Sequence, residues 1–94
     1  MKTLVWSATF VRAFKRSTKR DPALKERAED TLRQLAEDPF YHTLHSHKLK
    51  GELSGAWACT VDFDNRILFE FVKNPNVDEE EILLLTLGSH AEVY

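Results

Sequence analysis

The stretch from His47 to Phe71 is the feature that most constrains the fold, because it predicts a polar loop followed by a hairpin of two core strands. In the first strand, larger side chains alternate with small or polar ones, which is the period of a strand with one better-buried face. That face is predicted to carry Trp57, Cys59, Val61 and Phe63. Asp64 and Asn65 form a candidate two-residue turn. The second strand, residues 66–72, is apolar on both faces, as is typical of a central strand.

Two helices are predicted ahead of this hairpin, each with its own capping residue. Ser7 offers a hydroxyl to the first free N–H groups of a helix that ends near Arg20. Asp21 caps the second helix, which ends near Asp38 because the residue before a proline avoids helical backbone angles. The apolar stripe of this second helix is predicted to consist of Leu24, Ala28, Leu32 and Leu35. The two helices are therefore expected to form an antiparallel hairpin.

Two further apolar runs, residues 3–6 and 82–87, suit strands near the two ends of the chain. The element order is then βααβββ, and no repeat or linker divides the 94 residues. We therefore expect a single α+β domain, residues 1–94, with the helical hairpin packed on one face of a small, mostly antiparallel sheet. The helices separate the first strand from the others, which leaves both the last strand and the central strand as candidates for its partner.

Charge is divided unevenly along a chain whose formal net charge is −2. Residues 1–50 hold eleven Lys and Arg against six Asp and Glu, whereas residues 51–94 hold two against nine. The densest basic cluster comprises Arg12, Lys15, Arg16, Lys19 and Arg20. On a helix this cluster forms a basic face, which suits contacts with phosphates and equally suits a solvated surface. Composition alone leaves both interpretations open.

Cysteine usage and hydropathy exclude several classes of protein. The single cysteine, Cys59, cannot form an internal disulfide or a cysteine-pair zinc site, and its place in a strand favours a buried thiol. The histidines of residues 39–55 lack metal-ligand spacing, so we expect neither a metal nor another cofactor, and we expect His42 and His45 to be surface residues. No apolar run approaches the roughly 20 residues of a membrane span, and signal-peptide features are missing. The expected location is the cytoplasm, with no membrane partner.

Three short motifs accompany this order of elements: the loop HKLKG at residues 47–51, the strand DNRILFEF at 64–71 and the closing LLTLGSHAEVY at 84–94. Together with the order of elements, these motifs resemble the RelE/ParE superfamily, the toxins of bacterial type II toxin–antitoxin modules. The match covers nearly the whole chain, and the loop and tail motifs are most similar to the YafQ branch. The resemblance implies a RelE-like fold, a cognate antitoxin bound in a hetero-oligomer, and action on mRNA at the ribosome.

Toxins of this kind are usually ribosome-dependent endoribonucleases, in which the 2′-hydroxyl attacks the adjacent phosphate without a metal. The reaction needs a base for the hydroxyl proton, an acid for the leaving 5′-oxygen and positive charge on the phosphorane. By resemblance, His47 and His90 are the loop and tail histidines that transfer these protons. Asp64 is then the residue that orients a histidine or acts as base, and Arg66 the residue that holds phosphate oxygens.

Substrate contacts are implied by the same resemblance. Tyr94 occupies the closing aromatic position, where it would stack on a base. Lys48 and Lys50 would replace the strand lysines of RelE-like members. Thr60 and Thr86 stand where the YafQ branch has a histidine and an arginine.

Structural interpretations of these residues stay open beside the functional ones. Arg66 suits a salt bridge with a nearby carboxylate, Asp64 is common in turns for backbone reasons, and either histidine or Tyr94 suits a purely local contact. Two other functions are also open. One is a ParE-like toxin that binds DNA gyrase, and the other is a catalytically weak partner that binds the antitoxin and regulates the promoter. The pair of histidines favours the endoribonuclease over the gyrase binder, because a module that only binds needs no proton-transfer groups.

Overall fold

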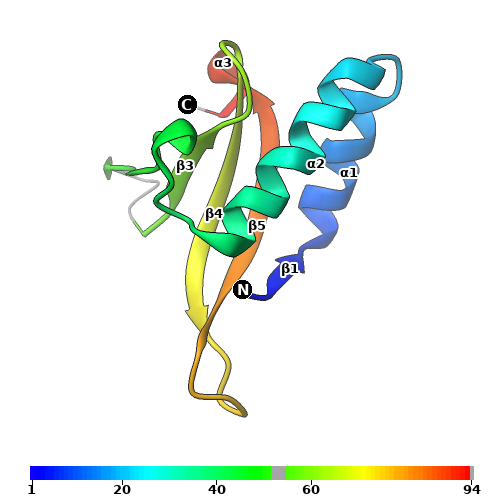
Figure 1. Cartoon of the computed structure of the whole chain (residues 1–94). Coiled ribbons are helices and arrows are strands. Elements are labelled where there is room, and N and C mark those ends of the chain that lie inside the picture. The colour runs from blue at the N-terminus through cyan, green and yellow to red at the C-terminus, as the bar shows by residue number, and fades with distance from the viewer. Residues whose placement is uncertain (52–54, 94) are drawn as a thin grey trace.

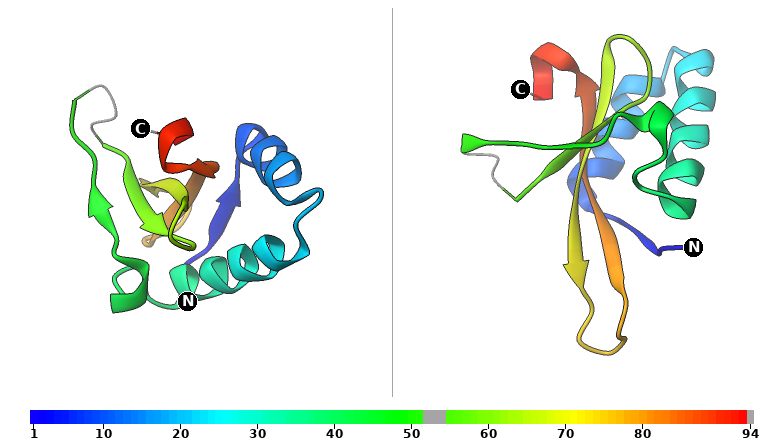
Figure 2. Two further views of the ribbon diagram at one scale, coloured as in Figure 1. Left: turned by 90° about the horizontal axis from the view of Figure 1, so that it is seen from above. Right: turned by 60° about the vertical axis from the view of Figure 1, so that its left-hand side comes forward.

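A computed structural model describes residues 1–51 and 55–93 and shows a layer of helices against a five-stranded sheet (Figure 1). The N-terminal half comprises β1 (Leu4–Trp6), α1 (Ala8–Thr18), α2 (Pro22–Glu37) and the 3₁₀ turn η1 (His42–Leu44). The C-terminal half comprises β2 (His47–Lys48), β3 (Trp57–Thr60), β4 (Asn65–Lys73), β5 (Glu80–Ser89) and α3 (His90–Val93). Figure 2 shows α1 and α2 together on one side of the sheet, which confirms the expected α+β fold. No helix in these described ranges is both long and apolar enough to span a bilayer.

The strands follow the order β1-β5-β4-β3-β2. β1 runs parallel to β5, with Val5 opposite Leu83, whereas the other three pairs are antiparallel. The first strand therefore pairs with the last, and the α1–α2 hairpin is the long crossover connection that a parallel pair requires. This pairing decides between the two partners that the sequence left open.

Both predicted helix caps are confirmed. The Ser7 hydroxyl accepts a hydrogen bond from the backbone N–H of Phe10 at 3.0 Å, and the Asp21 carboxylate accepts one from the N–H of Leu24 at 3.0 Å. The buried face of α1 includes Phe10 and Phe14, whose rings pack edge-on against Trp6. All five residues of the predicted basic cluster are exposed on and just after α1.

Apolar residues cover both faces of the sheet, which explains why β4 and β5 are apolar on both sides. The main core lies between sheet and helices, and its largest fully buried side chains are Phe10, Leu35, Cys59, Ile67, Phe69, Ile82, Leu84 and Leu87. A smaller core on the other face contains Leu49, Ala56, Ala58 and Leu68, with Leu85 and Val93 packed against it. The pairing of β4 with β5 shifts register between Leu68 and Phe69, so that Leu84 and Leu87 both belong to the main core.

The hairpin between β3 and β4 differs from its prediction. β3 ends at Thr60, and the chain reverses over residues 61–64 rather than at Asp64 and Asn65. The backbone N–H groups of Val61 and Asp62 both point to the carbonyl oxygen of Asn65, at 3.0 and 3.4 Å. The alternating pattern therefore stops before Phe63, which was predicted to be buried and is instead 96% exposed.

Candidate active site

A hollow of about 590 Å³ lies where several strand ends meet at one end of the sheet. Its lining consists of His45, His47, Thr60, Phe63, Arg66 and His90. The antiparallel register explains why residues so far apart in the chain meet here. Thr60 lies opposite Arg66, and Arg66 lies opposite Gly88, two residues before His90.

Three of the four predicted catalytic residues, His47, Arg66 and His90, share this hollow. Both histidines are exposed. Nδ1 of His47 lies 3.1 Å from the carbonyl oxygen of His45. The backbone N–H of His90 donates to the carbonyl oxygen of Asp64 at 2.8 Å, which joins the start of α3 to the β3–β4 loop. The fold thus supplies two imidazoles and one guanidinium to a common, solvent-accessible space.

Arg66 holds the β3–β4 loop as well as lining the hollow. Its Nη1 donates to three carbonyl oxygens, those of Asp62 at 2.6 Å, Asn65 at 3.0 Å and Phe63 at 3.2 Å. Nη2 and Nε have no hydrogen-bond partner within residues 1–51 and 55–93. Arg66 therefore makes backbone contacts rather than a carboxylate salt bridge, and two of its nitrogens remain available to a ligand.

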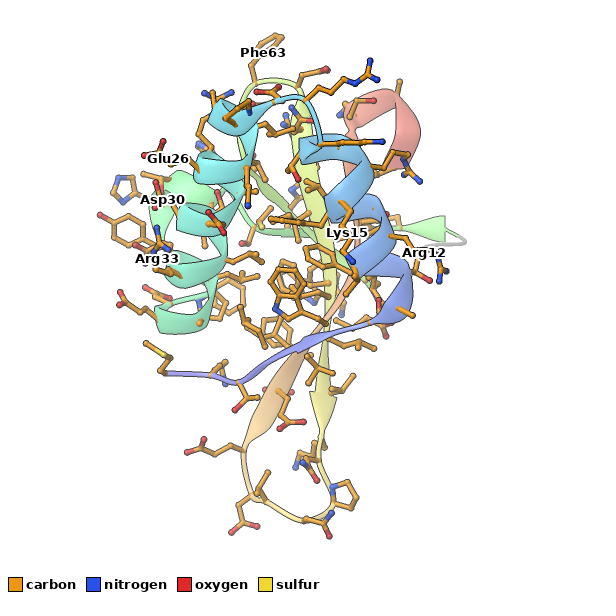
Figure 3. All side chains as sticks on the ribbon, turned by 90° about the vertical axis from the view of Figure 1, so that its right-hand side faces the viewer. Arg12, Lys15, Glu26, Asp30, Arg33 and Phe63 are labelled. Atoms are coloured by element: carbon orange, nitrogen blue, oxygen red, sulfur yellow. The ribbon has the colours of Figure 1, made fainter. Side chains whose placement is uncertain are left out.

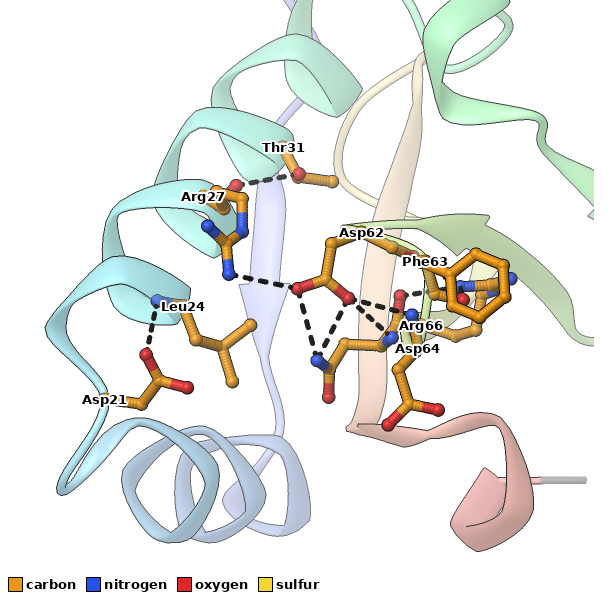
Figure 4. Close-up of polar contacts among 9 residues, drawn as sticks. Asp21, Leu24, Arg27, Thr31, Asp62, Phe63, Asp64 and Arg66 are labelled. Carbon is orange, nitrogen blue, oxygen red and sulfur yellow. Dashed lines mark hydrogen bonds and ion pairs between the residues drawn. The ribbon is translucent and has the colours of Figure 1, made fainter.

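The carboxylate that organises this loop belongs to Asp62 (Figure 4). Its Oδ1 accepts from the backbone N–H of Asp64 at 3.0 Å, and from the backbone N–H and side-chain Nδ2 of Asn65 at 2.8 and 3.0 Å. Its other oxygen lies 3.2 Å from a guanidinium nitrogen of Arg27 on α2. Burial raises the pKa of the Asp62 carboxyl, but the hydrogen bonds from Asn65 and Asp64 and the charge of Arg27 outweigh it and lower the pKa below 3.8.

The Asp64 carboxylate is exposed and does not line the hollow. Among the described residues it has no hydrogen bond or ion pair, and Asp64 contributes to the site through its backbone carbonyl. The contact through the Asp64 carbonyl fixes the backbone of His90, whereas the predicted roles of the Asp64 carboxylate, orienting a histidine or acting as base, stay predictions.

Two of the predicted substrate-binding residues, Lys48 and Lys50, are not in the lining of this hollow. Both lysines are exposed, and Tyr94 lies outside the described residues. Thr60 does line the hollow, whereas Thr86 is half-buried in β5 opposite Leu68.

Two lining residues, His45 and Phe63, were missed by the sequence analysis. His45 is exposed, as expected, but its backbone has a φ of 48°, a left-handed conformation that is uncommon outside glycine. The available clue was that His45 lies only two residues before His47 in the sequence. The clue for Phe63 was its position between Asp62 and Asp64, two residues typical of turns.

The described residues that line the hollow include no thiol. Cys59 is fully buried in β3, and burial raises the pKa of its thiol to about 12, so the thiol stays protonated near neutral pH. The prediction of a buried thiol is confirmed. In the part of the chain that the structure describes, no set of three or more His, Cys, Asp or Glu is arranged to hold a metal ion.

No protein-family model and no curated protein matches the sequence, but solved structures match its fold over nearly the whole chain. YafQ from E. coli strain BL21(DE3) gives a TM-score of 0.78 at 16% identity, over 100% of this chain and 99% of YafQ. A YoeB/ParE toxin from Agrobacterium tumefaciens gives 0.77 at 20% identity, over 96% and 99%. A conserved hypothetical protein from Helicobacter pylori gives 0.71 at 28% identity, over 100% of both chains. The chain has the RelE/ParE toxin fold.

In this RelE/ParE-fold domain, the chemistry of the hollow follows from three kinds of group. The imidazole rings of His45, His47 and His90 carry nitrogen atoms that can accept or donate a proton. The unoccupied nitrogens of Arg66 present N–H donors and a permanent positive charge to an anion. The Phe63 ring adds an aromatic surface at the rim. Such a set can bind a phosphate and move protons beside it.

Proposed function

We propose that this chain is the toxin of a type II toxin–antitoxin pair and that it cleaves mRNA in the cytoplasm as a ribosome-dependent endoribonuclease. The observation that carries the proposal is the meeting of His47, Arg66 and His90 in one hollow. The fold supports the first part, because YafQ is found in a DinJ–YafQ toxin–antitoxin complex and YoeB from Staphylococcus aureus in a YoeB–YefM complex.

In the proposed reaction, one of the two histidines accepts the proton of the 2′-hydroxyl while the 2′-oxygen bonds to phosphorus. The bond from phosphorus to the 5′-oxygen breaks, and the other histidine gives its proton to that oxygen. Arg66 stabilises the charge of the phosphorane through the nitrogens that do not hold the loop. The products are a 2′,3′-cyclic phosphate and a 5′-hydroxyl, so the protons balance within the pair of histidines and no metal is required.

The test is induced expression in bacteria without antitoxin, followed by primer extension on a reporter mRNA. Wild-type protein is expected to arrest growth and to produce new 5′ ends that depend on translation. His90→Ala should lose the cleavage by about 100-fold or more, the usual contribution of a general acid or base. His42→Ala is the matched control, because His42 is exposed but does not line the hollow.

Other outcomes of this experiment point to the competing functions. Growth arrest without cleavage would reject the endoribonuclease and favour a toxin that binds gyrase. No arrest, from protein shown by circular dichroism to be folded, would favour an inactive partner that binds the antitoxin.

The helical layer offers a surface for the proposed antitoxin. A groove of about 860 Å³ has Trp6 and Phe14 in its lining, together with Lys15, Lys19 and Lys25. Trp6 is 44% exposed, which is unusual for a large aromatic ring that also packs against the core. Apolar walls with a basic rim suit an amphipathic segment of opposite charge, so we expect an acidic antitoxin segment here. The open edges of β1 and β2 are the alternative surface.

Salt dependence tests this electrostatic fit. The association rate of toxin and antitoxin is expected to fall as salt is added, because basic residues steer an acidic partner from a distance. Lys15→Glu with Lys19→Glu should lower the rate by about tenfold or more at low salt. Lys73→Glu, at the end of β4 and outside the groove, should change it far less. A rate independent of salt would count against steering by this face.

A further inference from the structure

Phe63 is the most exposed of the large apolar side chains in the described ranges. It projects from the tip of the β3–β4 loop, at the end of the molecule opposite the β4–β5 loop (Figure 3). Phe40 is also exposed, but its ring packs against Trp57 and Phe71 at centroid distances of 5.3 and 5.8 Å. Phe63 has no such ring contact with a described residue. Folding does not account for an apolar ring at this position, because the ring stays exposed to solvent and packs against no part of the core.

The loop that carries Phe63 is nevertheless firmly held. The Asp62 carboxylate accepts two backbone hydrogen bonds inside the loop, and Arg66 donates to the carbonyl oxygen of Phe63 itself. The ion pair of Asp62 with Arg27 joins the loop to α2 (Figure 4). Since the backbone is tied on both sides of Phe63, the ring is presented in a defined place rather than on a loose segment.

The neighbours of the ring indicate what it binds. Phe63 lines the same hollow as Arg66 and the three histidines, and among the described residues of that lining it is the one large apolar side chain. The buried core of a protein–protein interface is more apolar than its rim, whereas the described neighbours of Phe63 in the hollow are polar. A nucleotide offers a flat base to the Phe63 ring and a phosphate to the guanidinium of Arg66.

We propose that Phe63 is the stacking platform for an unpaired base of the single-stranded RNA whose phosphate lies in the hollow. This inference rests on the proposed function, because it takes RNA as the substrate. Every base has a π face, so the platform strengthens binding with little preference for sequence. Phe63 lies three residues before Arg66, which donates to its carbonyl oxygen at 3.2 Å, so the stacked base would lie next to the phosphate that Arg66 contacts. Both contacts together would hold the reacting sugar in place.

Fluorescence of 2-aminopurine tests the platform without requiring cleavage. The probe is a short 2′-O-methylated RNA, which lacks the attacking hydroxyl, with one 2-aminopurine moved along its length. It is offered to the full chain both free and in the decoding site of ribosomes. Wild-type protein is expected to quench the fluorescence at one position, since stacking on an aromatic ring quenches it. Phe63→Ala should lose this quenching and weaken binding by about 10- to 100-fold, and Phe63→Trp should retain both.

Val77→Ala is the matched control, because Val77 is another exposed apolar residue, in the loop at the far end of the β4–β5 hairpin. It should bind and quench as the wild type does. Thermal melting of Phe63→Ala should match the wild type, since an exposed ring contributes no burial. Equal quenching by wild type and Phe63→Ala, or no quenching by wild type in either format, overturns the proposal.

Cleavage assays separate this proposal from the function on which it rests. Quenching that depends on Phe63, with no cleavage of unmodified RNA, supports the platform and rejects the endoribonuclease. Cleavage with kcat/KM unchanged in Phe63→Ala rejects the platform and keeps the endoribonuclease. If Phe63→Ala weakens antitoxin binding and leaves quenching unchanged, the ring belongs to a protein interface and the platform is rejected.

Discussion

Replacing Asp62 by alanine is expected to lower the free energy of unfolding by about 2–3 kcal/mol. The estimate comes from the contacts that the carboxylate makes. Its two part-buried hydrogen bonds from Asn65 contribute about 1 kcal/mol each, and its bond from the exposed N–H of Asp64 contributes less, because water replaces it. The ion pair adds about 0.5 kcal/mol, since Arg27 is half exposed.

Thermal and urea unfolding followed by circular dichroism measure this cost. For a chain of this length, 2–3 kcal/mol corresponds to a fall in Tm of roughly 10–20 °C. Asp64→Ala is a closely matched control, because it removes the same chemical group two residues away. The Asp64 carboxylate is exposed and unbonded among the described residues, so its loss should change stability by less than about 0.5 kcal/mol.

The pH dependence of the stability difference between wild type and Asp62→Ala tests the electrostatic contribution of the Asp62 carboxylate. The folded-state pKa of Asp62 lies below its ordinary 3.8, so the folded protein holds this proton less tightly than the unfolded chain. A group of this kind stabilises the fold above its unfolded pKa and loses that contribution as pH falls through its folded pKa. The stability gap between wild type and Asp62→Ala should therefore be constant above about pH 5 and narrow below about pH 4.

Two results would refute this reasoning. If Asp62→Ala melts within about 2 °C of the wild type, the hydrogen bonds of the loop do not contribute the energy assigned to them. If Asp64→Ala lowers the free energy of unfolding as much as Asp62→Ala does, the Asp64 carboxylate also holds the loop, and the geometry described for the loop is wrong.

Three further predictions concern the rest of the fold. Ellman's reagent should label Cys59 no faster than the protein unfolds, because the thiol is buried and protonated; rapid labelling of native protein at pH 8 would contradict this. Phe69→Ala should cost about 3–5 kcal/mol in urea unfolding, since the side chain is fully buried in the main core, and a loss below 1 kcal/mol would show that the core is not packed as described. Ser7→Ala should cost about 1 kcal/mol through loss of the α1 cap, measured against Ser7→Gly, which should cost only a few tenths.

The helices were predictable from the sequence to within a few residues, and so was the fold class. Ser7 and Asp21 cap their helices through hydrogen bonds to residues three positions ahead, so the cap lies within a few residues of sequence. Leu24 and Leu35 keep the helical period that places them in the core. Periodicity failed at the end of β3, where Phe63 continues the alternation of the strand although the strand has already stopped.

The site was predictable in part. The motifs drew attention to His47, Arg66 and His90, and the structure places all three in one hollow. The contacts of the Asp62 carboxylate were not predicted, because the carboxylate that closes the loop is set by where β3 ends and by the approach of Arg27 from α2. No pattern in the sequence carries either of those facts.

The sequence by itself determined the elements that depend on neighbours along the chain: two capped helices, apolar strands and a turn rich in polar residues. Only the tertiary structure decided that β1 pairs with β5, that Asp62 rather than Asp64 holds the loop, and that Phe63 stands exposed beside Arg66. The physical reason is the separation of the partners. Caps and periodicity involve groups a few residues apart, whereas strand order and the hollow depend on contacts between segments that are distant in sequence and meet only in the folded protein.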